Sequence, residues 1–242
     1  MVPWRELGRA KLGAGTSSAN SELVLAQRGD EFAIRLRGAE LMNSRSHASE
    51  EALAKLGCAG LGDRSGARVL IGGLGMGFTA RAALDALPRD AQVTIVELVP
   101  EVVEWNRTHL AELAKRPLDD PRVTLKVGDV ADVIAAQQEQ WNAILLDVDN
   151  GPDAFTAPSN AKLYGLKGLI ACRRALIPGG ALAVWSVEDD NKFTDRMRGA
   201  AFEVDKQRVP ARPNSTVKHV IWVGRRATRG DAGAGRNRTP RT

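Results

Sequence analysis

Polar and hydrophobic residues alternate along two short segments near the beginning of the chain, at residues 22–27 and 31–36. A period of two is typical of half-buried strands, and Gly29 between the segments favours a tight turn. Residues 37–43 could add a third short strand. The pattern therefore predicts a small antiparallel cap built on a β-hairpin.

A helical pattern follows the cap over residues 46–56. Ser46 and Ser49 are candidate N-caps, because a serine hydroxyl can accept a hydrogen bond from a free amide of the first turn. Glu50 and Glu51 follow in that turn, where the helix dipole favours negative charge. We expect this helix to link the cap to the rest of the chain.

From residue 68 onward, apolar runs alternate with longer amphipathic ones, which predicts parallel strands joined by right-handed helical crossovers. Strands are expected near residues 68–72, 92–97, 122–127, 142–147 and 180–187, and helices near residues 76–87, 100–115, 129–138 and 160–176. Two further alternating runs, at residues 202–209 and 217–224, predict an antiparallel pair at the sheet edge. This α/β layout resembles the class I methyltransferase (Rossmann-like) fold, with a mostly parallel seven-stranded sheet and a terminal antiparallel hairpin.

The length of 242 residues allows one α/β core with small attachments. We expect a hairpin cap and linking helix over residues 1–60, a methyltransferase-like nucleoside-binding domain over 61–226, and a disordered basic tail over 227–242. The net charge of +5 arises at the end of the chain: residues 225–242 hold six arginines and one acid, and the remaining 28 basic and 28 acidic residues cancel. Such a tail is more often solvated than a dedicated nucleic-acid arm, so we expect at most a weak contribution to nucleic-acid binding.

The sequence has neither an apolar stretch long enough to span a bilayer nor a signal-peptide pattern, which favours a soluble cytoplasmic protein. Cys58 and Cys172 lack the spacing of metal ligands, and each lies among alanine and leucine residues. We therefore expect both thiols in the core and predict no metal site.

The most informative motif is the glycine-rich run at residues 72–77, directly after the first parallel strand. Gly73, Gly75 and Gly77 allow the backbone to approach a ligand closely, since a Cβ at such positions would collide with it. Glu97 ends the next strand, where an acid can accept two hydrogen bonds from a ribose diol. Together these features predict a site for an adenosine-type ligand, and a tight turn without a ligand is the alternative.

Acids also follow two further strands of the expected sheet: Asp129, preceded by Gly128, and the pair Asp147 and Asp149. Because the carboxyl ends of parallel strands share one edge, we expect these residues to face one crevice. Asp147 is the candidate catalytic residue, because a partly desolvated carboxylate can hold an amine or accept its proton. The alternative for Asp129 is a helix N-cap, and for Asp147 a loop cap.

A nicotinamide-binding fold is the main competitor, because residues 75–80 also satisfy the pattern G-x-G-x-x-A. That frame starts later in the helix, and the sequence offers no evident proton-transfer partner. His47, His109 and His219 fall in the cap region, in a helix and in a late strand, where we expect structural roles. These features disfavour a dinucleotide oxidoreductase.

Over roughly residues 20–225, the sequence resembles the polyamine synthase group, the spermidine synthase-like branch of the methyltransferase fold. The resemblance rests on the cap, residues 41–53, the glycine turn with Thr79 and Arg81, Glu97, Gly128-Asp129, Asp147 and residues 163–180. It implies that Glu97 binds the ribose hydroxyls, Asp129 the adenine amino group and Asp147 the attacking amine. It also implies a small-molecule substrate and a homodimer.

Three positions depart from the pattern of that family, and each weakens amine recognition. Met76 stands where the family has the aspartate that meets the ammonium group of decarboxylated S-adenosylmethionine. Asn150 replaces a second aspartate after the catalytic one, with Asp149 shifted by one position, and Leu169 replaces a tyrosine.

Desolvating an unpaired ammonium group costs several kcal/mol, so a polyamine site needs several carboxylates. The departures therefore slightly favour methyl transfer from S-adenosylmethionine to a small nucleophile. True aminopropyl transfer from decarboxylated S-adenosylmethionine to a polyamine and a non-catalytic nucleoside-binding protein are the alternatives. The weaker candidates for the acceptor site are Asn43, Asp149 and Tyr164.

Overall fold

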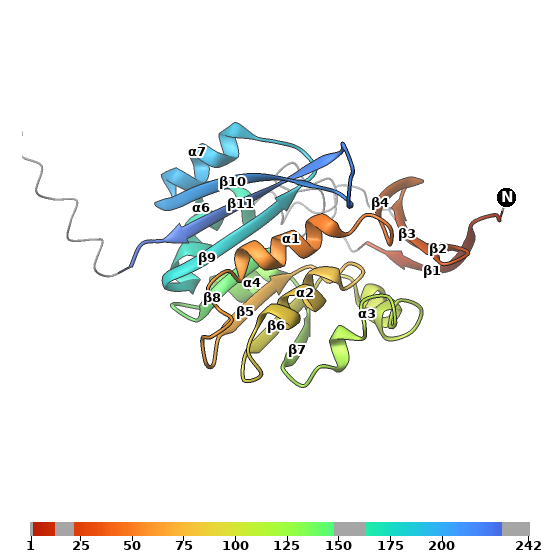
Figure 1. Cartoon of the computed structure of the whole chain (residues 1–242), viewed down its shortest axis with the longest axis horizontal. Coiled ribbons are helices and arrows are strands. Elements are labelled where there is room, and N and C mark those ends of the chain that lie inside the picture. Colours follow the sequence, from red (N-terminus) through yellow and green to blue (C-terminus); the bar gives the residue numbers. More distant parts are fainter. Residues whose placement is uncertain (1, 13–21, 148–162, 229–242) are drawn as a thin grey trace, which may run out of the picture.

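The computed structural model describes residues 2–12, 22–147 and 163–228, which form two β-sheets and the helices that cover the larger sheet (Figure 1). The smaller sheet lies at the end of the molecule where the chain begins. Within the described ranges, every helix is too short or too polar to span a lipid bilayer.

The smaller sheet is antiparallel and has the strand order β1-β2-β3-β4. Its strands are β1 (Arg5–Lys11), β2 (Glu22–Arg28), β3 (Glu31–Leu36) and β4 (Ala39–Asn43). The predicted hairpin is β2–β3, and the possible third strand is β4. Strand β1 was not predicted, because its sequence shows no clear alternation. Its Gly8 lies so close to Trp105 that a Cβ would come within 2.6 Å of Nε1, so contact with another element places this strand.

The larger sheet has the order β10-β11-β9-β8-β5-β6-β7, in which β11 is antiparallel to both of its neighbours and all other pairs are parallel. Its strands are β5 (Arg68–Gly72), β6 (Gln92–Glu97), β7 (Val123–Val127), β8 (Trp141–Leu146), β9 (Leu176–Ser186), β10 (Phe202–Pro210) and β11 (Lys218–Arg226). This confirms the predicted seven-stranded sheet with a terminal reversed hairpin. Because β6 and β8 flank β5 on opposite sides, the carboxyl ends of β5 and β8 form a switch point, the usual place for a ligand in such sheets.

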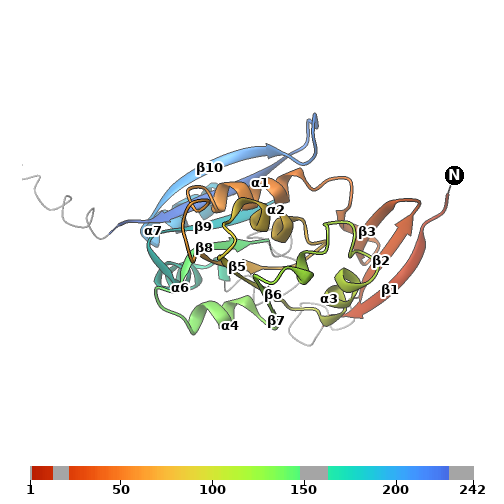
Figure 2. The same cartoon turned by 60° about the horizontal axis from the view of Figure 1, so that its bottom comes forward.

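Helices cover both faces of the larger sheet, with α1 and α2 on one side and α4 and α6 on the other (Figure 2). The helices are α1 (Ala48–Gly57), α2 (Phe78–Ala86), α3 (Pro100–Arg107), α4 (Val130–Ala135), α6 (Leu166–Ala175) and α7 (Asn191–Gly199), with a 3₁₀ turn at Pro117–Asp119. Neighbouring strand residues alternate between the two faces, so Leu145 packs toward α1 and Leu146 toward α6. The predicted core thiols Cys58 and Cys172 are both buried.

Two helices differ from the predicted pattern. The helix expected over residues 100–115 ends at Arg107, because Thr108 leaves the helical conformation and its hydroxyl donates to the carbonyl of Glu104 at 2.7 Å. His109 therefore follows the helix instead of lying within it. Helix α7 was not predicted, since only Phe193 and Met197 within it are large, apolar and buried.

Candidate active site

The glycine turn after β5 adopts backbone conformations that strongly favour glycine. Gly73, Gly75 and Gly77 have φ angles of 88°, 52° and 86°, in the left-handed region that side chains with a Cβ rarely adopt. The amide of Gly73 donates to the carbonyl of Val96 at 2.9 Å, which ties the turn to β6. The turn is thus a fixed rim at the carboxyl end of the sheet.

Packing accounts for one of these glycines. A Cβ on Gly77 would lie 3.1–3.2 Å from Asn106, Ala114 and Pro117, beneath the turn. The buried side-chain amide of Asn106 also donates to the carbonyl of Gly75 at 2.8 Å, which fixes the turn to α3. Sequence reasoning did not single out this asparagine, because nothing in its local pattern signals the contact.

Glu97 is buried at the end of β6, where both carboxylate oxygens accept hydrogen bonds from backbone amides. Leu74 donates to Oε2 and Val99 to Oε1, each at 2.8 Å. Burial raises the pKa of Glu97, although these amides oppose the shift. The carboxylate therefore fixes the glycine turn to the end of β6, and its predicted contact with a ribose diol stays a prediction.

Asp129 caps helix α4, which was the alternative to its predicted ligand role. Its Oδ1 accepts a hydrogen bond from the amide of Ala131 at 2.8 Å. The preceding residue, Gly128, has a φ of 155°, and the space where its Cβ would lie is open. The predicted contact of Asp129 with an adenine amino group stays a prediction.

Asp147 directly follows β8, and its amide donates to the carbonyl of Gly72 at 2.9 Å, beside the glycine turn. The hydroxyl of Thr79 donates to Oδ2 at 2.5 Å. Burial raises the pKa of Asp147 to about 6, although the hydroxyl opposes the shift. A carboxylate with this pKa is suited to accept a proton near neutral pH.

Glu50, on α1, lines the same cavity as Asp147. Burial raises the pKa of Glu50 to about 8, and the charge of Asp147 contributes to the rise. Thr79 connects the two residues, because the hydroxyl that binds Asp147 lies 3.4 Å from the backbone carbonyl of Glu50. Sequence reasoning placed Glu50 only in a helix first turn, so it missed this second site carboxylate.

A short hydrogen-bonded chain holds the carboxyl group of Glu50. The buried hydroxyl of Ser49 lies 2.9 Å from Glu50 Oε2 and 2.9 Å from His219 Nδ1. Trp185 packs edge-to-face against the His219 ring at 4.8 Å. Burial lowers the pKa of His219, which favours a neutral ring.

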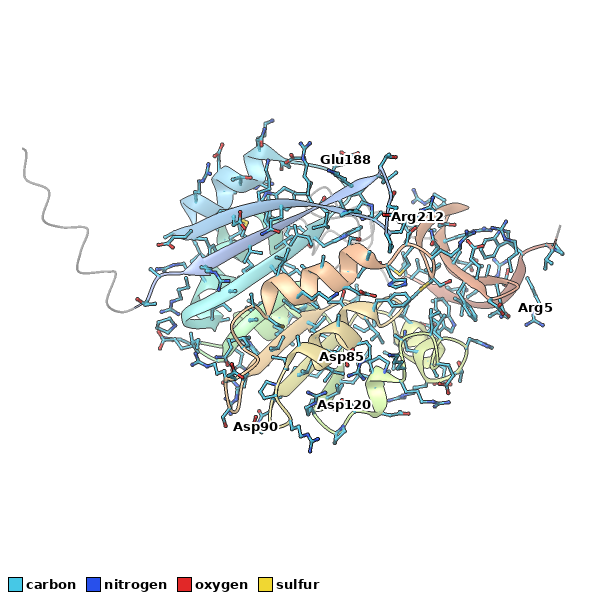
Figure 3. The ribbon with its side chains drawn as sticks, in the orientation of Figure 1. Arg5, Asp85, Asp90, Asp120, Glu188 and Arg212 are labelled. Carbon is cyan, nitrogen blue, oxygen red and sulfur yellow. The ribbon has the colours of Figure 1, made fainter. Side chains whose placement is uncertain are left out.

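These groups line a cavity of about 490 Å³ at the carboxyl edge of the sheet. Its walls come from β4, α1, the glycine turn, the end of β9 and the loop between β10 and β11. Arg212, in that loop, lies on the same side of the molecule as the smaller sheet, whereas Asp90 and Asp120 lie at the opposite edge of the larger sheet (Figure 3). The cavity thus opens between the cap and the larger sheet.

The cavity brings together some of the predicted site residues and leaves others outside. Asn43, Gly75 and Asp147 line it. The described lining does not include Gly73, Gly77, Glu97, Gly128, Asp129 and Tyr164. Tyr164 is a core residue that packs edge-to-face against Phe193 at 5.8 Å. Asp149 lies outside the described residues. Among those described, no group of three or more acids, histidines or cysteines is arranged to hold a metal ion.

Comparison with known proteins identifies the family. Residues 47–194, more than half of the chain, match the spermine/spermidine synthase domain. The chain belongs to this family. The matched segment extends from α1 to α7 and includes the glycine turn, Glu97, Asp147 and Glu50, whereas the smaller sheet and the terminal hairpin lie outside it.

Relatives in the spermine/spermidine synthase domain family carry two different activities in their names. The polyamine aminopropyltransferase of Mycobacterium tuberculosis is 31% identical over 170 residues, which are 69% of this chain and 31% of that protein. Putrescine N-methyltransferase 2 of Nicotiana tabacum is 38% identical over 120 residues, which are 48% of this chain and 31% of that protein. The chain therefore matches about a third of the length of these relatives.

A solved structure shows the same fold. Spermidine synthase from Thermotoga maritima superposes with a TM-score of 0.71 at 19% sequence identity, covering 92% of this chain and 73% of that one. The α/β fold predicted from the order of elements along the chain is thereby confirmed.

Proposed function

We propose that this protein is a transferase that moves an aminopropyl group from decarboxylated S-adenosylmethionine to an aliphatic amine. The observation that carries the proposal is the placement of Asp147, a partly buried carboxylate at the switch point of the sheet, in an acidic cavity beside the glycine turn. Family membership supports this reaction class. It favours aminopropyl transfer, the alternative in the sequence analysis, over the methyl transfer preferred there.

The rim beside the glycine turn suits a nucleoside. Leu98 and Val127, at the ends of β6 and β7, leave 46% and 55% of their surfaces exposed. Apolar side chains at neighbouring strand ends can pack against a flat base, and Glu97 precedes Leu98 and pairs with Val127 in the sheet. Glu97 would then bind the ribose hydroxyls and Asp129 the base edge, as the sequence predicts.

The chemistry demands little of the protein beyond position and proton removal. A sulfonium donor supplies an electrophilic carbon and a neutral thioether leaving group. Asp147 would hold the ammonium group of the acceptor and accept its proton, so that the amine nitrogen can form the new C–N bond as the C–S bond breaks. A raised pKa of about 6 makes Asp147 a better base than an ordinary aspartate.

Methyl transfer is the second candidate, and two observations favour it. Met76, in the glycine turn, is apolar and buried and cannot pair with the ammonium group of a decarboxylated donor. One relative is a putrescine N-methyltransferase. Under this alternative the same cavity and the same base would serve an intact S-adenosylmethionine.

Thermal denaturation with different nucleosides tests the proposal. Decarboxylated S-adenosylmethionine should raise the melting temperature more than S-adenosylmethionine at equal concentration, because the ligand that binds more tightly stabilises the native state more. Methylthioadenosine, which lacks the charged arm, serves as the reference nucleoside. A larger shift with S-adenosylmethionine would favour methyl transfer, and no shift with any of the three would refute a nucleoside site.

Two other expectations from the sequence stay predictions. A homodimer and a cytoplasmic location are consistent with the proposed function. Size-exclusion chromatography with light scattering would test the first, and fractionation of cells that produce the protein would test the second.

A further inference from the structure

The cavity has an acidic lining. Among its described residues, Glu40, Glu50 and Asp147 carry carboxyl groups, whereas Arg212 is the one permanent cation and His219 is a ring whose pKa is lowered. The other walls are largely apolar. An acidic, partly desolvated cavity favours a cationic ligand with an aliphatic body, because a charge buried without a partner is costly.

Within this lining, a hydrogen-bonded chain from His219 through Ser49 holds Glu50 in place. Ser49 can donate its single proton to Glu50 and then accepts a hydrogen bond from the Nδ1 proton of His219, at 2.9 Å in each case. The edge-to-face contact with Trp185 fixes the histidine ring. One carboxylate oxygen of Glu50 is therefore bound, and the group still lines the cavity.

Across the same cavity, Asp147 is held by the hydroxyl of Thr79. When two carboxyl groups repel each other in a partly buried site, the pKa of one of them rises, and a nearby cation offsets the repulsion. In the ligand-free protein the proton remains on Glu50 at neutral pH, consistent with its pKa of about 8. A bound ammonium group can replace that proton and interact with both acids.

Met76 increases the need for Glu50 as a second acid beside Asp147. It lines the cavity from the glycine turn, where it offers an apolar thioether and no charge. Among the described lining residues, Asp147 is then the carboxylate that the carboxyl edge of the larger sheet supplies, so a second acid for the ammonium group must come from another element. Glu50, on α1, is placed to supply it.

We propose that Glu50 is a specificity-determining residue that joins Asp147 in holding the reacting ammonium group of the acceptor and releases its own proton when that group binds. This inference rests on the proposed function, because it assigns the residue to the same acceptor site. The exchange is balanced: the carboxyl proton of Glu50 goes to solvent, and the ammonium charge replaces it. Because a neutral nucleophile cannot replace the charge of that proton, Glu50 favours a cationic amine as the acceptor.

Glu50→Gln tests the proposal, with Glu51→Gln as the matched control. Glu51 is the next residue of α1, but it pairs with His47 and Lys55 and does not line the cavity. Each variant is titrated with 1,4-diaminobutane by calorimetry, in the presence of methylthioadenosine. Because a charged hydrogen bond contributes about 1.5–3 kcal/mol, affinity should fall roughly tenfold or more in Glu50→Gln and stay near the wild-type value in Glu51→Gln.

Measuring proton release on diamine binding shows whether Glu50 contacts the ammonium group or only supports the structure of the cavity. Titrations at pH 7 in buffers with different ionisation enthalpies should show that wild type and Glu51→Gln release up to one proton per bound diamine, and that Glu50→Gln releases almost none. Equal affinity or equal proton release in all three proteins would overturn the proposal. So would a failure of wild type to bind the diamine.

A separate titration with methylthioadenosine alone distinguishes the two proposals. If all proteins bind the nucleoside and only the diamine results are negative, the role of Glu50 is wrong while the nucleoside site stands. If wild type does not bind the nucleoside, the proposed function fails first.

Discussion

Glu50→Gln should stabilise the ligand-free protein at alkaline pH and leave its stability nearly unchanged in mild acid. In the folded protein, burial and the charge of Asp147 raise the pKa of Glu50 from 4.5 to about 8. Glutamine resembles the protonated acid in shape and can still accept the hydrogen bond from Ser49. The substitution therefore removes an ionisation that the fold disfavours.

The sign and size of the effect follow from linkage. Below pH 4.5 the carboxyl group is protonated in both the folded and the unfolded chain, so it has no effect on the pH dependence. Between pH 4.5 and about 8 the unfolded chain loses the proton first, and the stability that the raised pKa provides at low pH is progressively lost. Each pKa unit corresponds to about 1.4 kcal/mol, which gives an upper bound of roughly 5 kcal/mol; because Glu50 is partly exposed, solvent screening reduces it to about 2–3 kcal/mol.

Thermal denaturation between pH 5 and pH 8.5 measures this effect. A change of 1 kcal/mol shifts the melting temperature of a domain of this size by about 2–4 °C. The variant should therefore exceed wild type by roughly 5–10 °C at pH 8.5 and by little at pH 5. Glu51→Gln, which loses only exposed ion pairs, should show no such upward trend. A difference between Glu50→Gln and wild type that does not change with pH would refute the raised pKa of Glu50.

Three further substitutions test the turn and its supports. Gly77→Ala should lower the unfolding free energy by about 1–3 kcal/mol in urea denaturation, because φ is positive and the site is crowded, whereas Gly199→Ala, in a helix with ordinary contacts, should not. Glu97→Gln should lower the unfolding free energy by about 1–3 kcal/mol, because its amide NH₂ would face a backbone N–H donor. The variant should also lose most of its affinity for the nucleoside in calorimetry, and unchanged affinity would show that Glu97 does not bind it. Asp129→Ala should lose about 1 kcal/mol of stability and Asp129→Asn much less, because asparagine also caps helices, and equal losses would contradict the cap.

The periodic parts of the sequence were sufficient to predict the larger sheet. Its buried strands are apolar runs that alternate with amphipathic helical segments, and this alternation predicts parallel strands with helical crossovers. Strand β1 and helix α7 lack this signal, because contacts with other elements, such as Gly8 against Trp105, determine their placement.

Position at a strand end predicted the cavity for one acid and not for the others. Asp147 follows β8 and lines the cavity, whereas Asp129 follows β7 and caps α4. Glu50 is different, because a first-turn glutamate is explained well by its own helix. Its partnership with Asp147 arises only when α1 packs on α2 and Thr79 joins them. The contact of Ser49 with His219 spans 170 residues in sequence, and no local pattern could indicate it.

The most direct test of the central claim is mass spectrometry of the products that the purified protein forms from 1,4-diaminobutane with decarboxylated S-adenosylmethionine and, separately, with S-adenosylmethionine. We expect an aminopropylated diamine with the decarboxylated donor, and loss of that product in Asp147→Asn while the variant still binds methylthioadenosine. A methylated diamine formed only with S-adenosylmethionine, or an undiminished product in the variant, would contradict the proposed aminopropyl transfer.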